Sequence, residues 1–244
     1  MGALDSSVLT AMKKVTLIII AVLVVLGAVG FMLMNRVTAP ASEPPFVSSL
    51  GDITPAQNVH GAFMVDTEAS VVRWSGSKTF IQNYVDTGTI RVKSGTATIT
   101  DGVITSGKLI FDMRSITVDA TGIGENEPML AQHLKSSDFF SVEEYPEASF
   151  AMTSAVPDAN DPNRIVVTGN LTIKNNTNPL SVPLQVGKRG DALVVFGRAE
   201  VDRTLWDIRF GSGTFFKNLG DAVIDDRFLL DFELVAEEQD GDVN

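Results

Sequence analysis

Two residues near the middle of the chain have side chains suited to proton transfer. His133 is followed five positions later by Asp138, and a carboxylate beside an imidazole can orient a general base. No serine or threonine is marked out as a nucleophile for that base. We therefore expect His133 to be a half-buried, locally hydrogen-bonded helix residue, and the protein not to be an enzyme. An enzyme that uses His133 with Asp138 is kept as an alternative.

Other patterns typical of catalytic or metal sites lack the context that their chemistry needs. Ser75 to Lys78 has the S-x-x-K spacing of penicillin-recognising enzymes, but it follows a strand-like run instead of opening a helix. Asp221, Asp225 and Asp226 lack the ligand offsets of a calcium loop. The glycine pairs at 122–124 and 211–213 lack the third glycine of a dinucleotide loop and are expected to be turns. We expect no cofactor and no metal site.

The elements around these residues follow a strand pattern. From Phe63 onward apolar and polar residues alternate, as they do on strands with one buried face. Strands are predicted around 71–74, 89–93, 108–113, 148–152, 165–173, 180–186, 193–201 and 228–235. Turns are predicted at 101–102, 106–107, 175–176 and 189–191, where Gly, Asn and Asp occur. Many short strands at regular spacing predict an all-β sandwich or barrel.

One helix is expected to interrupt the strands, between Asn126 and Ser137. Asn126 or Glu127 is suited to cap it and Pro128 to its first turn. Leu130 and Leu134 then lie on one face. Phe139 and Phe140 follow directly, so bulky apolar side chains are expected at a loop beside the sheet.

The N-terminal region predicts a membrane anchor. Residues 15–34 are apolar and uncharged apart from the polar Thr16, and they are long enough to cross a bilayer core of about 30 Å. A cleaved signal peptide usually has a shorter apolar run, of about 7–15 residues, and is the alternative. We expect a cytoplasmic tail at 1–14, a transmembrane helix at 15–34, a proline-rich linker at 35–61, a barrel domain at 62–236 and an acidic tail at 237–244. The lysines before the span favour a cytoplasmic N-terminus, which places the barrel outside the cytoplasmic membrane.

Charge and cysteine content exclude several functions. The chain has a net charge of −11, and without residues 1–36 it keeps 16 basic and 29 acidic residues, which gives −13. A domain of this charge is repelled by nucleic acid, so no nucleic-acid partner is expected. The chain has no cysteine, which excludes disulfides, thiolate metal sites and cysteine nucleophiles.

Six motifs, in their order along the chain, resemble the YceI-like family of bacterial lipid-binding, lipocalin-like proteins. They are Val65-Asp66 with Ser70 to Lys78, Gly88 to Ile90, Phe111 to Ile116, His133 to Phe140 with Tyr145-Pro146, Gly169 to Lys174, and Asp202 to Ser212. The resemblance covers residues 62 to 236. It implies an extended eight-stranded antiparallel barrel around an apolar tunnel that holds a polyisoprenoid-type lipid.

Two features depart from this family. Many of its members carry a histidine before the glycine that matches Gly88, whereas here Asp86-Thr87 follows an expanded loop at 79–85. Many members also have a cleavable signal, whereas this chain is expected to be anchored. The departure at Asp86-Thr87 removes any headgroup contact made through that histidine.

We therefore predict a membrane-anchored, periplasmic or external barrel that binds an isoprenoid or quinone-like lipid and sequesters or transfers it unchanged. The residues expected to line its cavity or mouth are Trp74, Phe111, Phe139, Phe140, Phe150, Leu171 and Trp206. The expected partners are the lipid and, through the N-terminal helix, the membrane. A homodimer is kept as an alternative to a monomer. An envelope-stress or interaction module, with a barrel filled by its own side chains, is the main alternative.

Overall fold

The computed structural model describes residues 53–56, 58–122, 126–161 and 163–239, all within one compact unit, Ser48–Asn244. The predicted tail at 1–14, the predicted anchor at 15–34 and most of the predicted linker lie outside the described residues. Among the helices of the described part, none combines the length and the apolar character that a bilayer crossing requires.

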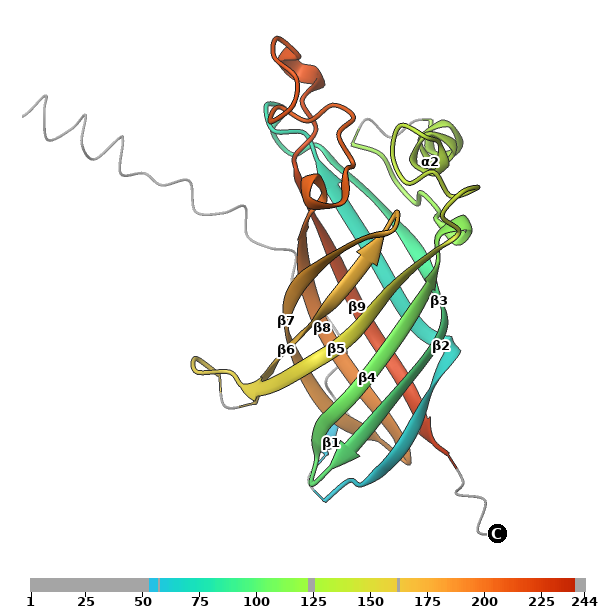
Figure 1. The fold of residues 1–244 in the computed structure, drawn as a ribbon, viewed down its shortest axis with the longest axis vertical. Helices are drawn as coiled ribbons and strands as arrows, with labels where there is room; N and C mark the ends of the chain where they lie inside the picture. The colour runs from blue at the N-terminus through green and yellow to red at the C-terminus, as the bar shows by residue number, and fades with distance from the viewer. Residues whose placement is uncertain (1–52, 57, 123–125, 162, 240–244) are drawn as a thin grey trace, which may run out of the picture. The chain divides into compact units, whose positions relative to one another are not determined.

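The described residues form an eight-stranded antiparallel barrel (Figure 1). Each strand from β2 to β8 pairs with the next one along the chain, and β9 pairs with both β8 and β2, which closes the barrel. This confirms the predicted all-β barrel with one short helix. The strands are β2 (Gly61–Ser77), β3 (Val85–Thr100), β4 (Val103–Asp112), β5 (Glu147–Pro157), β6 (Ile165–Ile173), β7 (Asn176–Arg189), β8 (Ala192–Asp202) and β9 (Arg227–Glu238).

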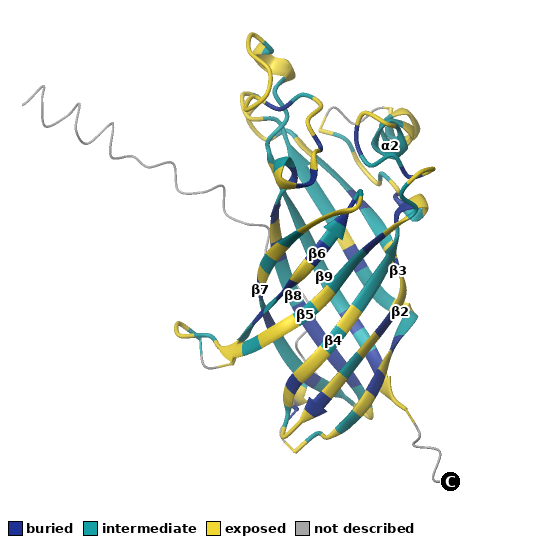
Figure 2. Ribbon diagram, in the orientation of Figure 1, coloured by how far each residue is buried: buried dark blue, intermediate teal, exposed yellow. Residues whose placement is uncertain are grey.

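Alternation along the strands sets which side chains face the interior (Figure 2). In β2, for example, Phe63 and Val65 are buried while Met64 between them is exposed. The turn between β3 and β4 is formed by Asp101 and Gly102, with φ of 53° and 76°. Two successive positive φ values give the hairpin turn whose twist matches the strands, as the sequence predicts.

One predicted turn is wrong. Ser106 and Gly107 lie inside β4, paired with Thr98 and Ala97 of β3. The register between the two strands shifts just beyond them, between Thr98 and Ile99. The extra residue on β4 is Thr105, so the dipeptide lies beside a β-bulge within the strand.

The predicted helix is present as α2 (Glu127–Lys135), with Pro128 in its first turn. Asn126 precedes it in a left-handed conformation, with φ of 67°, and its side chain makes no capping hydrogen bond. The predicted position is therefore right, whereas the capping bond is absent. Leu134 packs against the hydrophobic cluster that includes Met113, Phe139 and Ile208.

The barrel domain includes residues at both ends that the sequence assigns to the linker and to the tail. A two-residue strand, β1 (Thr54–Pro55), pairs with β7, and Ala56 is buried in the core. Glu237 and Glu238 complete β9 by pairing with β2. Each pairing adds main-chain hydrogen bonds that composition alone does not reveal.

Two hydrophobic clusters line the barrel interior. The lower cluster is built around Phe63, Ile99, Leu193 and Leu234. The upper cluster lies nearer α2 and contains Met113, Ile116, Phe139, Val142, Leu171, Ile173, Val201, Trp206 and Ile208. Two short 3-10 turns contribute to it, η2 (Met113–Ser115) and η3 (Arg203–Trp206). A third, η4 (Gly220–Ala222), lies in the long connection from β8 to β9.

Candidate functional site

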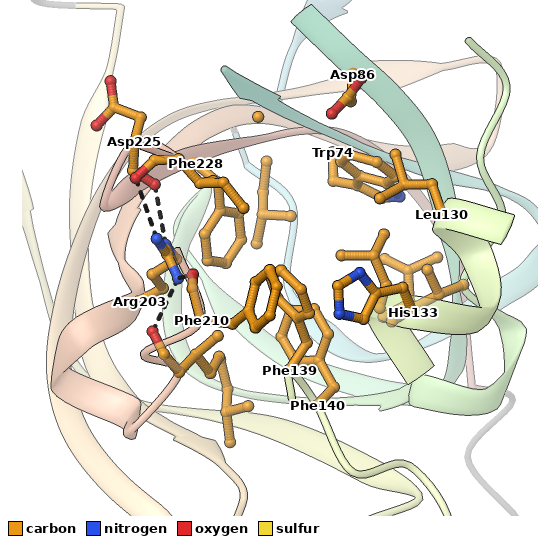
Figure 3. Close-up of a pocket in the computed structure, with 18 of the residues that line it drawn as sticks. Trp74, Asp86, Leu130, His133, Phe139, Phe140, Arg203, Phe210, Asp225 and Phe228 are labelled. Carbon is orange, nitrogen blue, oxygen red and sulfur yellow. Dashed lines mark hydrogen bonds between the residues drawn. The ribbon is translucent and has the colours of Figure 1, made fainter. Parts of the chain in front are cut away.

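A cavity of about 380 Å3 lies within the α2 end of the barrel. Figure 3 shows α2 on one side of it and the β8–β9 connection on the other. Most of its lining is aliphatic or aromatic. The apolar side chains that face it are Val72, Trp74, Ile90, Phe111, Met113, Ile116, Leu130, Leu134, Phe139, Phe140, Ala148, Leu171, Ile173, Ile208, Phe210, Ala222, Ile224, Phe228 and Leu230.

A second cavity, of about 130 Å3, lies within the lower cluster. The two cavities share the lining residues Val72, Phe111, Leu171 and Leu230, so the cavities adjoin along the barrel interior. An apolar chain bound in the larger cavity therefore has the smaller one as its continuation. The larger cavity is within the range of about 300–1,000 Å3 typical of small-molecule sites.

Six of the seven predicted site residues face this space. The larger cavity, here called the upper cavity, is lined by Trp74, Phe139 and Phe140. The smaller, lower cavity is lined by Phe150, and both cavities are lined by Phe111 and Leu171. The structure therefore brings these side chains together around one apolar interior. Their contact with a ligand stays a prediction.

Trp206 lies elsewhere, contrary to its prediction as a cavity or mouth residue. It lines neither cavity and its side chain is 1% exposed within the upper cluster. Its Nε1–H donates a hydrogen bond to the carbonyl oxygen of Leu171 at 3.0 Å. The η3 turn removes Trp206 from the strand alternation, and the indole packs behind the cavity wall instead of forming it.

Trp74 is held at the cavity by a hydrogen bond and a close approach. Its Nε1–H donates to the carbonyl oxygen of Thr117 at 3.0 Å. A Cβ at the neighbouring Gly88 would lie 2.7 Å from that indole nitrogen and 2.0 Å from the Thr117 oxygen. Only glycine fits at position 88, because a side chain there would displace both partners.

His133 forms part of the aromatic wall. Its ring meets Phe139 and Phe210 edge-on, with centroid distances of 4.9 and 4.6 Å. Its Nε2 lies 3.1 Å from Asp138 Oδ2, so the predicted local hydrogen bond is present. Asp138 is exposed and does not line the cavity. The enzyme alternative predicts both side chains around a polar pocket, whereas His133 faces an apolar one.

A few polar side chains lie at the cavity mouth, in the loop that follows β2 and at the start of β3. The Lys78 ammonium lies 4.5 Å from the centre of the Tyr84 ring, a cation–π contact. Asp86 accepts a hydrogen bond from the Gly122 N–H at 2.9 Å. Burial, followed by the nearby Asp86 carboxylate, raises the pKa of the Tyr84 phenol. Ser75 lies at the end of β2 and Lys78 in a β-bridge, so the S-x-x-K match is a strand end, as predicted.

Sequence reasoning missed Arg203, which organises the opposite side of the mouth. Its side chain is 4% exposed, and all five of its N–H groups have acceptors. Figure 3 shows some of these hydrogen bonds. They are donated to the carbonyl oxygens of Asp225, Ile208, Phe210 and Ile224 and to a carboxylate oxygen of Asp226. The guanidinium thereby ties together both ends of the β8–β9 connection.

The surroundings of Arg203 explain its unusual burial. Desolvation lowers its pKa, while the carboxylates of Asp226, Asp225 and Asp202 oppose that shift. Asp202 also accepts from the Thr204 N–H at 3.0 Å and fixes the start of η3. In the sequence, Arg203 lies directly after Asp202 and three residues before Trp206. This spacing is the signal that could have indicated the hydrogen-bonded network around Arg203. Among the described residues, no group of three His, Asp or Glu side chains is arranged to hold a metal ion.

Comparison with known proteins agrees with this architecture. A family model described as a YceI-like domain matches residues 63–236. This chain belongs to the YceI-like family. Among curated YceI proteins, that of Escherichia coli O17:K52:H18 is 31% identical over 80 residues, which are 33% of this chain and 40% of that protein. The YceI protein of Escherichia coli O157:H7 is 30% identical over the same length.

Two solved structures share the YceI-like fold. Burkholderia cenocepacia BcnA matches with a TM-score of 0.55 and 22% identity, over 70% of this chain and 98% of BcnA. A polyisoprenoid binding domain from Saccharophagus degradans, implicated in plant cell wall breakdown, matches with a TM-score of 0.55 and 16% identity. That match covers 74% of this chain and 100% of the domain. At these identities the likeness establishes the fold alone.

Proposed function

We propose that this YceI-like protein binds one amphiphilic apolar molecule, an isoprenoid or quinone-like lipid, and sequesters or transfers it without chemical change. The observation that carries the proposal is the apolar cavity of about 380 Å3, which adjoins a second one inside the barrel. A barrel filled by its own side chains, which the interaction-module alternative requires, leaves no such space.

The driving force is removal of the lipid tail from water. Each methylene buried contributes about 0.8 kcal/mol, so a branched hydrocarbon chain gains several kcal/mol without any polar contact. A dry apolar interior is the environment in which such a chain is retained.

Polar recognition is confined to the mouth. The Lys78 ammonium is placed to donate a hydrogen bond to a headgroup oxygen at the end of the cavity. The Tyr84 hydroxyl donates to the Asp86 carboxylate, which leaves its oxygen as an acceptor at the same place. Asp86-Thr87 stands where many family members carry the histidine before the glycine, and Asp86 lines the same end of the cavity as Lys78. A hydroxyl, carbonyl or phosphate oxygen fits the Lys78 donor.

The comparisons support the class of ligand. One structural neighbour is a polyisoprenoid binding domain, and its whole length matches the fold described above. The apolar residues that face the barrel interior here give that fold a hydrocarbon-compatible lining.

The cellular setting in this proposal rests on the sequence. An apolar run at 15–34 that follows Lys13 and Lys14 supports a single-span anchor with the barrel outside the cytoplasmic membrane. A tether would confine the carrier to the membrane from which it takes its lipid. No step in this function calls on His133 as a base.

The test is to purify residues 37–244, extract them with organic solvent and identify the extracted molecules by mass spectrometry. The proposal predicts an isoprenoid or quinone in the extract, or its uptake by the delipidated protein at one molecule per barrel. An empty extract together with no uptake of added isoprenoid would overturn it.

A further inference from the structure

Two loops beside the cavity mouth carry exposed aromatic side chains. The first follows β2 and comprises residues 79–84; the second comprises residues 210–220 of the β8–β9 connection. We call them the rim loops. Phe80 of the first is 65% exposed and Phe216 of the second is 48% exposed, and neither lines the upper cavity. Their exposure therefore has no role in holding the tail of a bound lipid.

The rim loops lie side by side. The Thr79 N–H donates to the Val223 carbonyl oxygen at 3.2 Å, and the Asp225 N–H donates to the Ser77 carbonyl oxygen at 2.9 Å. Phe80 and Phe216 line one surface groove between the loops. Both loops stand at the α2 end of the barrel, where the cavity opens (Figure 1).

The charge of the rim loops differs from that of the rest of the domain. Their sequences, TFIQNY and FGSGTFFKNLG, contain no acidic residue and one basic residue, Lys217. The chain after residue 36 has a net charge of −13. The carboxylates of Asp225 and Asp226 that follow the second loop are half-buried, which leaves Asp221 as the exposed acid at its end. The rim loops therefore give this acidic protein a nearly neutral, aromatic surface beside the cavity mouth.

We propose that the rim loops dock the barrel onto a lipid bilayer, with Phe80 and Phe216 inserted at the level where headgroups meet acyl chains. The proposal rests on the function proposed above, because a lipid that leaves the bilayer must pass the mouth that these loops border. A neutral, aromatic rim matches an interface in which apolar side chains are buried and carboxylates are excluded. Docking there lets the hydrocarbon tail pass between bilayer and cavity without crossing water.

Binding driven by insertion has a distinct signature. Each phenylalanine that leaves water strengthens partitioning by roughly tenfold or more. The acidic body of the barrel is repelled by anionic lipid, so neutral vesicles are expected to bind it better than anionic ones. Salt does not release a barrel that is held by apolar contacts.

The barrel is tested as residues 48–244, because the predicted span would insert into vesicles by itself. This fragment is one compact unit, and all its core residues lie between Ala56 and Ala236. Flotation with phosphatidylcholine vesicles compares it with a double variant, Phe80→Ser with Phe216→Ser. The matched control is Val156→Ser, which removes an apolar side chain that is 55% exposed on the strand β5.

The wild-type fragment and Val156→Ser are expected to float with the vesicles, and the double variant to lose about 100-fold in partitioning, since two phenylalanines are removed. Melting temperature checks that all three are folded. A wild-type fragment that stays with the aqueous fraction, or a double variant that binds as the wild type does, overturns the proposal.

A fluorophore reports which end of the barrel meets the bilayer, since the chain has no native cysteine. Gly213→Cys labels the second rim loop, where an added Cβ lies 3.4 Å from its nearest neighbour, Val223. Asp191→Cys labels the β7–β8 turn as the control. Quenching by bilayer-embedded spin labels is expected only at position 213. Quenching at neither position, or at 191 alone, contradicts the proposal.

The outcome for docking is separable from that for lipid binding. Phe80 and Phe216 lie outside the cavity, so the double variant is expected to take up a detergent-solubilised isoprenoid as the wild type does while extracting it from vesicles more slowly. If no variant takes up the lipid, the proposed function fails. If uptake is normal and vesicle extraction is equally fast in the double variant, only the docking proposal fails.

Discussion

The indole nitrogen of Trp206 donates a hydrogen bond to the backbone carbonyl of Leu171 at 3.0 Å, and the Leu171 side chain faces both cavities. Trp206 therefore sets the position of the wall residue at which the two cavities adjoin, while its own ring stays outside them. Trp74, the other tryptophan, faces the upper cavity directly.

The two tryptophans are expected to respond differently to a ligand. In Trp206→Phe, where Trp74 is the remaining indole, added isoprenoid should displace water around the ring and shift its emission to the blue. In Trp74→Phe, the emission of Trp206 should stay constant, because that ring is already buried. Fluorescence titration of both variants is the measurement. A response from Trp206 alone would contradict the placement of the binding site.

Arg203 is expected to stabilise the fold as well as the mouth. Arg203→Met removes the donor to one oxygen of the Asp226 carboxylate and to four carbonyl oxygens, so the free energy of unfolding should fall by about 3–5 kcal/mol. Arg209→Met, which removes an exposed ion pair with Asp207, should change it by less than about 1 kcal/mol. Urea unfolding of both variants measures the difference. Equal losses would show that the buried network contributes no more than the surface pair.

His133 is expected to act as an aromatic wall residue. His133→Phe keeps the ring that meets Phe139 and Phe210, so the dissociation constant for the lipid should change less than about tenfold, as in a volume-conserving swap. Binding assays and mass spectrometry of the recovered ligand provide the readout. A ligand altered by the wild type and left intact by His133→Phe would establish the enzyme alternative instead.

Tyr84 is expected to ionise above the pKa of about 10 of a free tyrosine. Its folded-state pKa is raised, so its contribution to stability is complete below the unfolded value and is lost as pH rises through the folded one. Ultraviolet titration of tyrosinate in Tyr145→Phe isolates this group. Adding Asp86→Asn should lower the pKa, though not to the free value, because burial is the larger cause. A normal pKa in the single variant would place Tyr84 in open water.

Alternation in the sequence was sufficient to locate the eight barrel strands, since it reports directly which face of each strand is buried, but it missed β1 and the end of β9. Barrel closure was not predictable from it, because the pairing of β9 with β2 joins segments that are far apart in the chain. The resemblance to the YceI-like family supplied that step. Ser106-Gly107 shows the limit of local signals, since these residues are paired inside β4 beside a bulge and do not form a turn.

The site was predictable for residues in regular strands and for Phe139 and Phe140 after α2, and not for Trp206 in the η3 turn. Trp74 and Phe111 face the cavity because strand alternation fixes their direction. Trp206 is the last residue of the η3 turn, so the same aromatic signal gave the wrong location. Arg203 was missed because its role depends on how the β8–β9 connection folds back on it, which brings the carbonyl oxygens of Phe210 and Ile224 to its guanidinium.

The most direct test of the central claim is to fill the cavity and measure lipid binding. Leu230 faces both cavities, whereas its neighbour Leu229 lines neither, so Leu230→Trp and Leu229→Trp make the same change on opposite faces of β9. Titration with an isoprenoid should give one molecule per barrel for the wild type and Leu229→Trp, and none for a folded Leu230→Trp. Undiminished binding by Leu230→Trp, or no binding by the wild type, would contradict the account.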